Sequence, residues 1–208
     1  MLIKNLSKGE IMMETNTNKL TGKDLINVGI YSAIYFVIVF LVAMLGMVPI
    51  LYPMLVVFCP IIGGIPFMLF LTKVKKSGMI FIMSILMGAL MLVSGMGIYP
   101  LIVSIFSGLI SELIYRKGNY SSAKMAVLTN ATFSLWVWAC FLLLFLNRDS
   151  YMASRVESVG QDYVTTLNNL TPNWLCPVLL AVCFVCGLIG GVLGKKMMAK
   201  HFEKAGIA

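Results

Sequence analysis

Charged residues are scarce in this sequence. They make up 12% of its 208 residues, whereas a soluble domain usually has about 25%. Hydrophobic residues make up 60%, and the mean hydropathy is +0.94. This balance predicts an integral membrane protein. The net charge of +8 does not indicate nucleic-acid binding, because no basic stripe with interleaved aromatic residues is present.

Groups for catalysis and metal binding are also missing. His201 is the only histidine, and it lies in the predicted tail, so no Ser–His pair can form within the membrane. There is no H-E-x-x-H motif and no glycine-rich phosphate loop, and no His, Cys or carboxylate cluster has metal-ligand spacing. The five cysteines all lie in apolar segments, which argues against a disulfide framework. We therefore expect no enzymatic activity, no metal and no cofactor.

Six apolar segments are predicted to cross the membrane, because a transmembrane helix needs about 20 mostly apolar residues. They cover residues 25–46, 50–72, 79–95, 100–115, 125–146 and 175–194. We therefore predict an all-α integral membrane protein with a six-helix transmembrane domain at residues 25–197. Residues 1–24 would precede this domain as a cytoplasmic segment, and residues 198–208 would follow it as a cytoplasmic tail.

The positions of lysine and arginine predict the orientation of these spans, since basic residues collect in cytoplasmic loops. Of the sixteen lysines and arginines, only Arg148 and Arg155 fall in predicted outer loops. Both termini are therefore predicted to be cytoplasmic. Carboxylates are too few within the spans to form a proton relay, which disfavours a proton-coupled transporter.

The longest predicted outer loop, residues 147–174, contains an amphipathic pattern. Ser154-x-x-Glu157 fits a capping box at the start of a helix, and Pro172 would end that helix. Such a helix can lie on the outer leaflet or act as a lid over a pocket that opens outward, and the two are compatible. Its apolar face repeats at spacings of three and four residues, through Val156, Val159, Tyr163, Leu167 and Leu170.

Glu112 is the single acidic residue within a predicted span. Arg116 follows it at the i+4 position, a spacing that favours an ion pair on a helix. We expect this pair at the inner boundary of the membrane, and contact with a partner protein is the alternative.

Small residues recur at the spacing that lets helices pack closely in lipid. The last span contains two overlapping G-x-x-x-G motifs between residues 187 and 194, which we interpret as packing within the chain. The first span contains Gly29-x-x-x-Ala33 with Ser32 alongside. This motif lies on the predicted cytoplasmic side, where either packing within the chain or docking of a partner can explain it.

The segment CPIIGGIPF, at residues 59–67, places two prolines and two glycines inside a predicted span. Both residue types weaken a helix interior. Because lipid cannot satisfy free backbone groups, we predict a bent or interrupted helix rather than a loop. Gly63 and Gly64 would pack closely against a neighbouring helix.

Aromatic and neutral polar residues collect in the outer half of the predicted bundle. They match the make-up of a small-molecule site, which is an apolar cavity with a few polar groups, although an interfacial aromatic belt is the alternative. Without buried charge, the ligand is expected to be largely neutral and to contain a ring. The candidate substrate-binding residues are Tyr52, Tyr99, Ser104, Asn130, Trp136, Trp138, Asn173 and Trp174.

The stretches GGIPFMLFLTKVKKSGMIFIMSILMG and SGLISELIYRKGNYSSAKMAVLTNATFS resemble those of the Trep_Strep family of bacterial membrane proteins. The six spans, the N-in topology and the opening LTGKDLINVGIYSAIYF are similar to substrate-binding (S) components of energy-coupling factor (ECF) transporters. This resemblance implies that the protein captures a vitamin-like micronutrient outside a bacterial cell. It would then topple in the cytoplasmic membrane while docked on a scaffold subunit, driven by two cytoplasmic ATPases.

In related S components, an A-x-x-x-A motif in the first helix contacts the scaffold, and glycine replaces the first alanine here. The resemblance therefore implies a scaffold contact through Gly29, Ser32 and Ala33, and through Gly63 and Gly64 of the next span. Ligands of such proteins lie under the loop joining spans 1 and 2, against spans 4 to 6. The alternative is an accessory or assembly protein without a ligand. A self-sufficient permease is less favoured, because ionisable residues and an internal repeat are missing.

Overall fold

The structure, a computed structural model, describes residues 20–74, 76–200 and 203. Within these residues it is helical and contains no strand, which confirms the predicted all-α fold. Most of the predicted N-terminal segment and C-terminal tail, with His201, lies outside the described residues. The elements are α2 (Gly22–Ala43), the 3₁₀ helix η1 (Met44–Met47), α3 (Leu55–Leu71), α4 (Met79–Val93), α5 (Tyr99–Lys117), α6 (Ala123–Phe133), α7 (Leu135–Ala139), α8 (Leu142–Leu146), α9 (Arg148–Val159), α10 (Gln161–Leu170) and α11 (Leu175–Met197).

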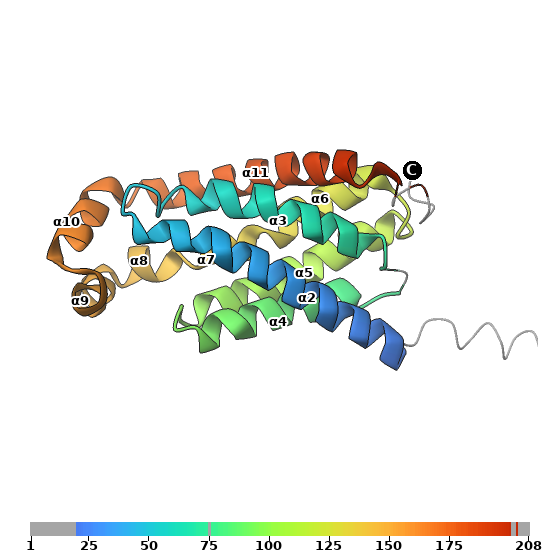
Figure 1. The fold of residues 1–208 in the computed structure, drawn as a ribbon, viewed down its shortest axis with the longest axis horizontal. Coiled ribbons are helices and arrows are strands. Elements are labelled where there is room, and N and C mark those ends of the chain that lie inside the picture. Colours follow the sequence, from blue (N-terminus) through green and yellow to red (C-terminus); the bar gives the residue numbers. More distant parts are fainter. Residues whose placement is uncertain (1–19, 75, 201–202, 204–208) are drawn as a thin grey trace, which may run out of the picture.

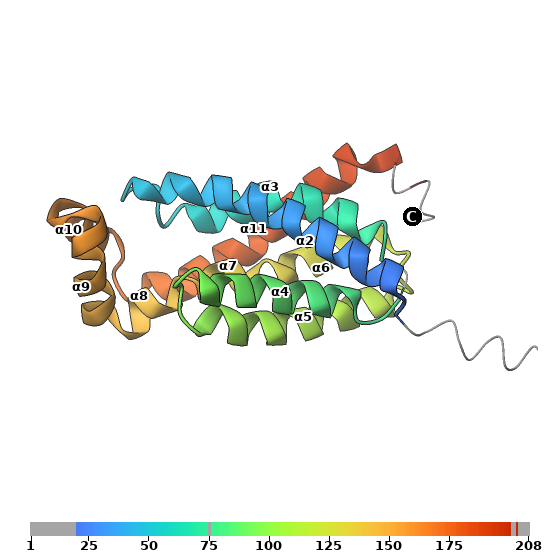
Figure 2. The ribbon, with the colours of Figure 1, turned by 60° about the horizontal axis from the view of Figure 1, so that its bottom comes forward.

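The longer helices run along the longest axis of the molecule, and α9 and α10 lie at one end (Figures 1 and 2). We call this end the capped end. Helices in contact include α3 with α11, α4 with α5, α6 with α11, and α2 with α3. The described chain begins and finishes at the opposite end of the bundle (Figure 1), as expected for termini on one side of a membrane. That this side is cytoplasmic stays a prediction.

Two helical stretches among the described residues combine the length and the hydropathy needed to cross a membrane. They are Gly22–Met47, with 26 residues, and Leu175–Met197, with 23 residues. The apolar helices α3 and α4 are shorter, with 17 and 15 residues. The count of six spans therefore stays a prediction. The predicted second span also begins later than expected, because residues 48–54 form turns before α3.

The predicted fifth span, residues 125–146, is not one helix but three: α6, α7 and α8. Hydroxyl side chains before the first break bond to the carbonyl one turn back. Thr129 Oγ1 donates to Met125 O at 2.7 Å. Ser134 Oγ donates to Asn130 O at 2.8 Å. Such bonds compete with the regular backbone pattern and bend helices, which accounts for the break at Ser134.

The glycines of α11 form close contacts with the backbones of two neighbouring helices. A Cβ added at Gly190 would lie 2.2 Å from the carbonyl oxygen of Pro60, and one added at Gly64 would lie 2.6 Å from the carbonyl carbon of Gly190. The other glycine pair of α11 faces α6, since a Cβ added at Gly187 would lie 2.6 Å from Cα of Ala131. The predicted packing within the chain is confirmed, and the two motifs pack against two different helices.

The segment 59–67 forms the middle of α3, which is continuous although two prolines lie inside it. It is therefore neither a loop nor an interrupted helix. Gly63 packs against α2, where an added Cβ would lie 3.1 Å from Cε2 of Tyr35, and Gly64 packs against α11. Both glycines are buried. Their neighbours are helices of the same chain, so neither offers a surface for the scaffold contact that the resemblance implied.

The carboxylate of Glu112 caps α4 and does not pair with Arg116, so the expected ion pair is wrong. Its Oε2 accepts hydrogen bonds from the backbone N–H of Ile80 at 3.0 Å and of Phe81 at 3.3 Å. Its Oε1 accepts one from the Tyr120 hydroxyl at 2.9 Å. The first N–H groups of a helix lack partners within the helix and carry partial positive charge. They therefore hold this buried carboxylate more directly than an exposed arginine would.

Gly190→Ala should lower the midpoint of thermal unfolding, because overpacking a close contact typically costs about 1–3 kcal/mol. Gly29→Ala is the matched control, since it is the same change within a helix but an added Cβ meets no atom within 4 Å. At residue 29, alanine should leave the stability unchanged or raise it, because alanine has a helix propensity about 1 kcal/mol more favourable than that of glycine. Equal midpoints for the two variants in the same detergent would contradict the backbone contact.

Candidate ligand-binding site

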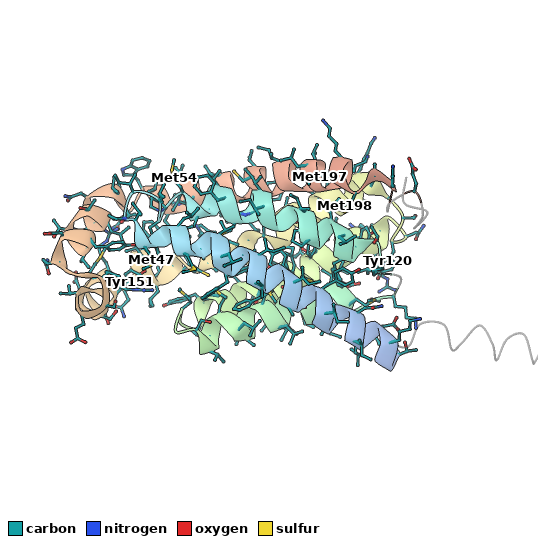
Figure 3. The ribbon with its side chains drawn as sticks, in the orientation of Figure 1. Met47, Met54, Tyr120, Tyr151, Met197 and Met198 are labelled. Atoms are coloured by element: carbon teal, nitrogen blue, oxygen red, sulfur yellow. The ribbon has the colours of Figure 1, made fainter. Side chains whose placement is uncertain are left out.

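A cavity of about 250 Å³ lies at the capped end of the bundle. Its walls come from α2, η1, α3, α4 and α7, and α9 and α10 complete it. Figure 3 shows two lining residues, Met47 and Tyr151, at this end. The lining residues are Phe36, Val39, Phe40, Ala43, Met44, Gly46, Met47, Tyr52, Leu55, Cys59, Met91, Ser94, Met96, Trp136, Val137, Cys140, Phe141, Tyr151, Arg155, Val159 and Tyr163.

The cavity wall is mostly apolar and rich in aromatic rings and sulfur. Rings come from α2, α7, α9 and α10, and methionine side chains come from η1 and from the end of α4. Arg155 is the only charged side chain among the described residues that line the cavity. Rings and polarisable sulfur both make favourable contacts with aromatic groups. The composition is that of a small-molecule site, apolar with few polar groups.

The helices α9 and α10 together form a helical hairpin, which we call the lid. Gly160 separates the two helices and has a φ of 87°, a conformation that residues with a side chain rarely adopt. The side chain of Arg148 joins the two ends of the hairpin. It donates hydrogen bonds to Oδ1 of Asn168 at 2.7 Å and of Asn173 at 3.0 Å. It also donates to the carbonyl oxygen of Thr171.

The single amphipathic helix predicted for this loop is therefore wrong, because Gly160 divides it into two. The predicted capping box of Ser154 and Glu157 is also wrong. Ser154 lies within α9, where its Oγ donates to the carbonyl oxygen of Tyr151 at 2.8 Å, and Asn147 occupies the N-cap position. Each lid helix nevertheless buries apolar side chains. Of the predicted apolar face, however, only Leu167 is buried, whereas Val159 and Leu170 are exposed.

Among the described residues, two hydrogen bonds between oxygen atoms join the lid to the bundle. The hydroxyls of Tyr52 and Tyr151 lie 2.7 Å apart. The hydroxyl of Tyr163 donates to the backbone carbonyl of Gly46 in η1. Burial raises the pKa of Tyr163 to about 12. The hydroxyl therefore keeps its proton at neutral pH and can donate this bond.

A family model supplies the relationship of this chain to known proteins. The model of Trep_Strep, described as a hypothetical bacterial integral membrane protein, matches residues 22–204. The chain belongs to this family. The match begins at the first residue of α2 and covers every helix of the bundle and the lid. No curated protein and no solved structure matches the chain. Membership of Trep_Strep confirms the predicted bacterial membrane protein.

Some of the residues predicted to bind substrate do line the cavity of this Trep_Strep protein. They are Tyr52, which also bonds to the lid, and Trp136 of α7. Trp138, two residues further on, lies outside the wall. Its Nε1 donates to the carbonyl oxygen of Cys176 in α11 at 2.9 Å, so it connects two helices.

The other predicted residues lie away from the cavity wall. Asn130 donates from Nδ2 to a backbone carbonyl of α11 at 2.6 Å. Ser104 is buried in the contact between α4 and α5. Asn173 accepts a hydrogen bond from the arginine that closes the lid. Trp174 is 67% exposed, and Tyr99 is half-buried at the first residue of α5.

The lid supplies lining residues that the sequence did not identify as binding residues. Tyr151, Arg155, Val159 and Tyr163 all line the cavity, and they follow one another at intervals of four residues. This spacing repeats on one side of a helix, so it could have placed Tyr151 and Arg155 beside Val159 on α9. Tyr163 already belonged to the predicted apolar face and lies on α10, beyond Gly160.

The residues predicted to contact a scaffold lie in different environments. Gly29 and Ala33 are exposed on α2, on the side that no other described helix covers. Ser32 is buried, and its Oγ has no hydrogen-bond partner among the described residues. Only the first two therefore lie on a surface of the Trep_Strep protein.

Tyr163→Phe should loosen the lid and speed deuterium exchange of its amides by about threefold to tenfold, since one hydrogen bond contributes about 0.5–1.5 kcal/mol. The pKa of this tyrosine is raised in the folded state, so its hydrogen bond is present below the ordinary value and is lost only as pH rises through about 12. The effect, corrected for intrinsic exchange, should therefore be equal at about pH 6 and pH 9.

Tyr99→Phe is the control for this experiment. It removes a hydroxyl from a half-buried tyrosine that does not line the cavity, and lid exchange should stay at the wild-type rate. Unchanged exchange in the Tyr163→Phe variant would show that this bond does not hold the lid.

Proposed function

We propose that this protein is the substrate-binding subunit of an ATP-driven importer of the ECF type. It would capture a small micronutrient at the capped end and deliver it while docked on a scaffold subunit. Partner ATPases would supply the energy, and the chain itself would bind its cargo without transforming it. The proposal joins the resemblance of the sequence to S components with the cavity beneath the lid.

The lid-covered cavity is the observation that carries the proposal. A volume of about 250 Å³ lies just below the range of about 300–1,000 Å³ typical of small-molecule pockets, which suits a compact ligand. The indole Nε1 of Trp136, in the cavity wall, is buried and makes no hydrogen bond of regular geometry among the described residues, although the Tyr35 hydroxyl interacts with it. A ligand acceptor next to this indole would add a hydrogen bond of regular geometry.

The exposed face of α2 supports docking on another membrane subunit. Gly29 and Ala33 lie on this face, and an added Cβ at Gly29 meets no atom within 4 Å. Small residues at this spacing let a second helix approach closely in lipid. They do not serve packing within the chain, which is the task of the glycines in α3 and α11.

Native mass spectrometry of the protein, purified in mild detergent, tests the binding function. We expect a small molecule retained by the wild-type protein and lost from Ala43→Leu, because Ala43 lines the cavity and a larger side chain fills it. Ala33→Leu, the same change on the exposed face of the same helix, should keep the ligand. Retention of the ligand by both variants would place it outside this cavity.

Co-purification with a co-expressed scaffold subunit and its ATPases tests the docking function. Ala33→Leu should abolish the complex, because leucine prevents close approach at Gly29 and Ala33. Ala43→Leu should assemble normally, and so should Ala181→Leu, which makes the same change at an exposed position of α11. A complex that forms without any retained ligand would instead support the accessory protein. If no complex forms with the wild-type protein in any lipid, the importer proposal fails.

A further inference from the structure

We propose that the cavity binds a ring-containing molecule that carries one carboxylate, and that Arg155 is the counter-ion of this carboxylate. The inference deepens the proposed function and rests on it, because it requires the cavity to hold a small molecule. It replaces the expectation of a largely neutral ligand. That expectation rested on the absence of buried charge in the predicted spans, whereas Arg155, from the predicted outer loop, lies in the cavity wall.

Arg155 is a cation in an apolar wall and has only weak partners there. Its guanidinium carbon lies 5.1 Å from the centroid of the Tyr151 ring, and its Nη2 lies 4.0 Å from the sulfur of Met96. No carboxylate approaches it within 4.0 Å among the described residues. A guanidinium has five N–H donors, and neither a ring face nor a thioether sulfur is a strong acceptor. The site therefore has unused capacity to bind an anionic group.

The other arginine of the lid shows what a structural role looks like in this protein. Arg148 does not line the cavity, and its guanidinium bonds to three oxygen acceptors at the ends of the hairpin. Its donors are used to close the lid. Arg155 has no comparable set of acceptors, although it lies only two turns away on the same helix. Arg148 therefore has a structural role in the lid, whereas the guanidinium of Arg155 is available to a ligand.

The acidic residues of the lid do not neutralise Arg155. Asp149, Glu157 and Asp162 are exposed, and none of them lines the cavity. A cation that is partly removed from water and has no counter-ion is unfavourable. A carboxylate brought in by a ligand would form charge-assisted hydrogen bonds with the guanidinium, and two parallel bonds fit its planar shape.

The rest of the cavity fits the body of such a ligand. Aromatic rings and methionine sulfurs surround the space, and both favour contact with an aromatic ring. The hydroxyls of Tyr52 and Tyr151, 2.7 Å apart, lie in the same wall and can share hydrogen bonds with a polar substituent. The small volume restricts the body to one or two rings.

The phosphate of a lipid headgroup is a second source of an anionic group near the capped end. We favour a small molecule because Arg155 lies in the wall of a cavity together with these phenols and Trp136, rather than alone on the outer surface of the lid. The experiment below separates the two sources by changing the lipid.

The test uses two probes of nearly equal shape, naphthalene-2-carboxylate and its neutral amide, naphthalene-2-carboxamide. Binding is measured by calorimetry to the full chain in nanodiscs of phosphatidylcholine, after removal of any retained ligand. The wild-type protein should bind the carboxylate at least about tenfold more tightly than the amide, since a charge-assisted bond contributes about 1.5–3 kcal/mol. Arg155→Gln should reduce this ratio to about one, and Arg155→Lys should keep part of it.

Arg148→Gln is the matched control, because it removes the same charge from the same lid helix. It should weaken both probes alike by loosening the lid and should leave their ratio unchanged. The ratio should also persist in nanodiscs that contain anionic phosphatidylglycerol. Loss of the ratio there would assign Arg155 to lipid headgroups and overturn the inference.

A wild-type protein that binds the two probes equally, or binds neither, would also overturn the inference. Neither result decides the proposed function, which depends on whether Ala43→Leu loses a retained molecule. A retained molecule without an acidic group, displaced from the wild-type protein and lost from Ala43→Leu, would keep the binding function and reject the carboxylate.

Discussion

The backbone contact between α3 and α11 is the constraint on which the rest of the bundle depends. At Gly64 and Gly190 neither helix has room for a side chain. Close approach of this kind brings helices together in lipid, where burial of apolar area adds little driving force. The other glycine pair of α11 admits α6 in the same way. Because α11 is engaged on two sides, no described residue of it reaches the cavity wall.

The cavity is therefore left to a second set of elements, and the breaks in the fifth predicted span make it possible. The short helix α7 lies between two breaks. It presents Trp136 to the cavity and Trp138 to a carbonyl of α11. Trp136 therefore forms part of the wall, and Trp138 connects α7 to α11. The lid then covers the space through Tyr151 and Tyr163, which bond to Tyr52 in the turns between η1 and α3 and to the backbone of η1.

The composition of the site was predictable from the sequence, but most of its members were not. An apolar space with rings and few polar groups was expected, and Tyr52 and Trp136 belong to it. Asn130 and Trp138 have side chains that could bind such a ligand, but each donates its hydrogen bond to a backbone carbonyl of α11 instead. A helix pattern assigns residues to faces, but it does not identify the element that each face meets. Arg155 was overlooked for the same reason. From the sequence, an arginine in an outer loop is expected to be solvated, and only the position of the lid shows that this one lines the cavity.

The sequence by itself determined an all-helical membrane protein, the positions of most helices and the places where helices pack closely. These features follow from local quantities: apolar length, helical periodicity and the spacing of glycines. Only the tertiary structure decided that the glycines of α11 meet α3 and α6, that Glu112 caps α4, and that the lid turns Arg155 toward the cavity. Each of these depends on contacts between residues far apart in the chain. Local periodicity leaves such pairings open, and the turn at Gly160 divides the lid into two helices that both contribute to the cavity wall.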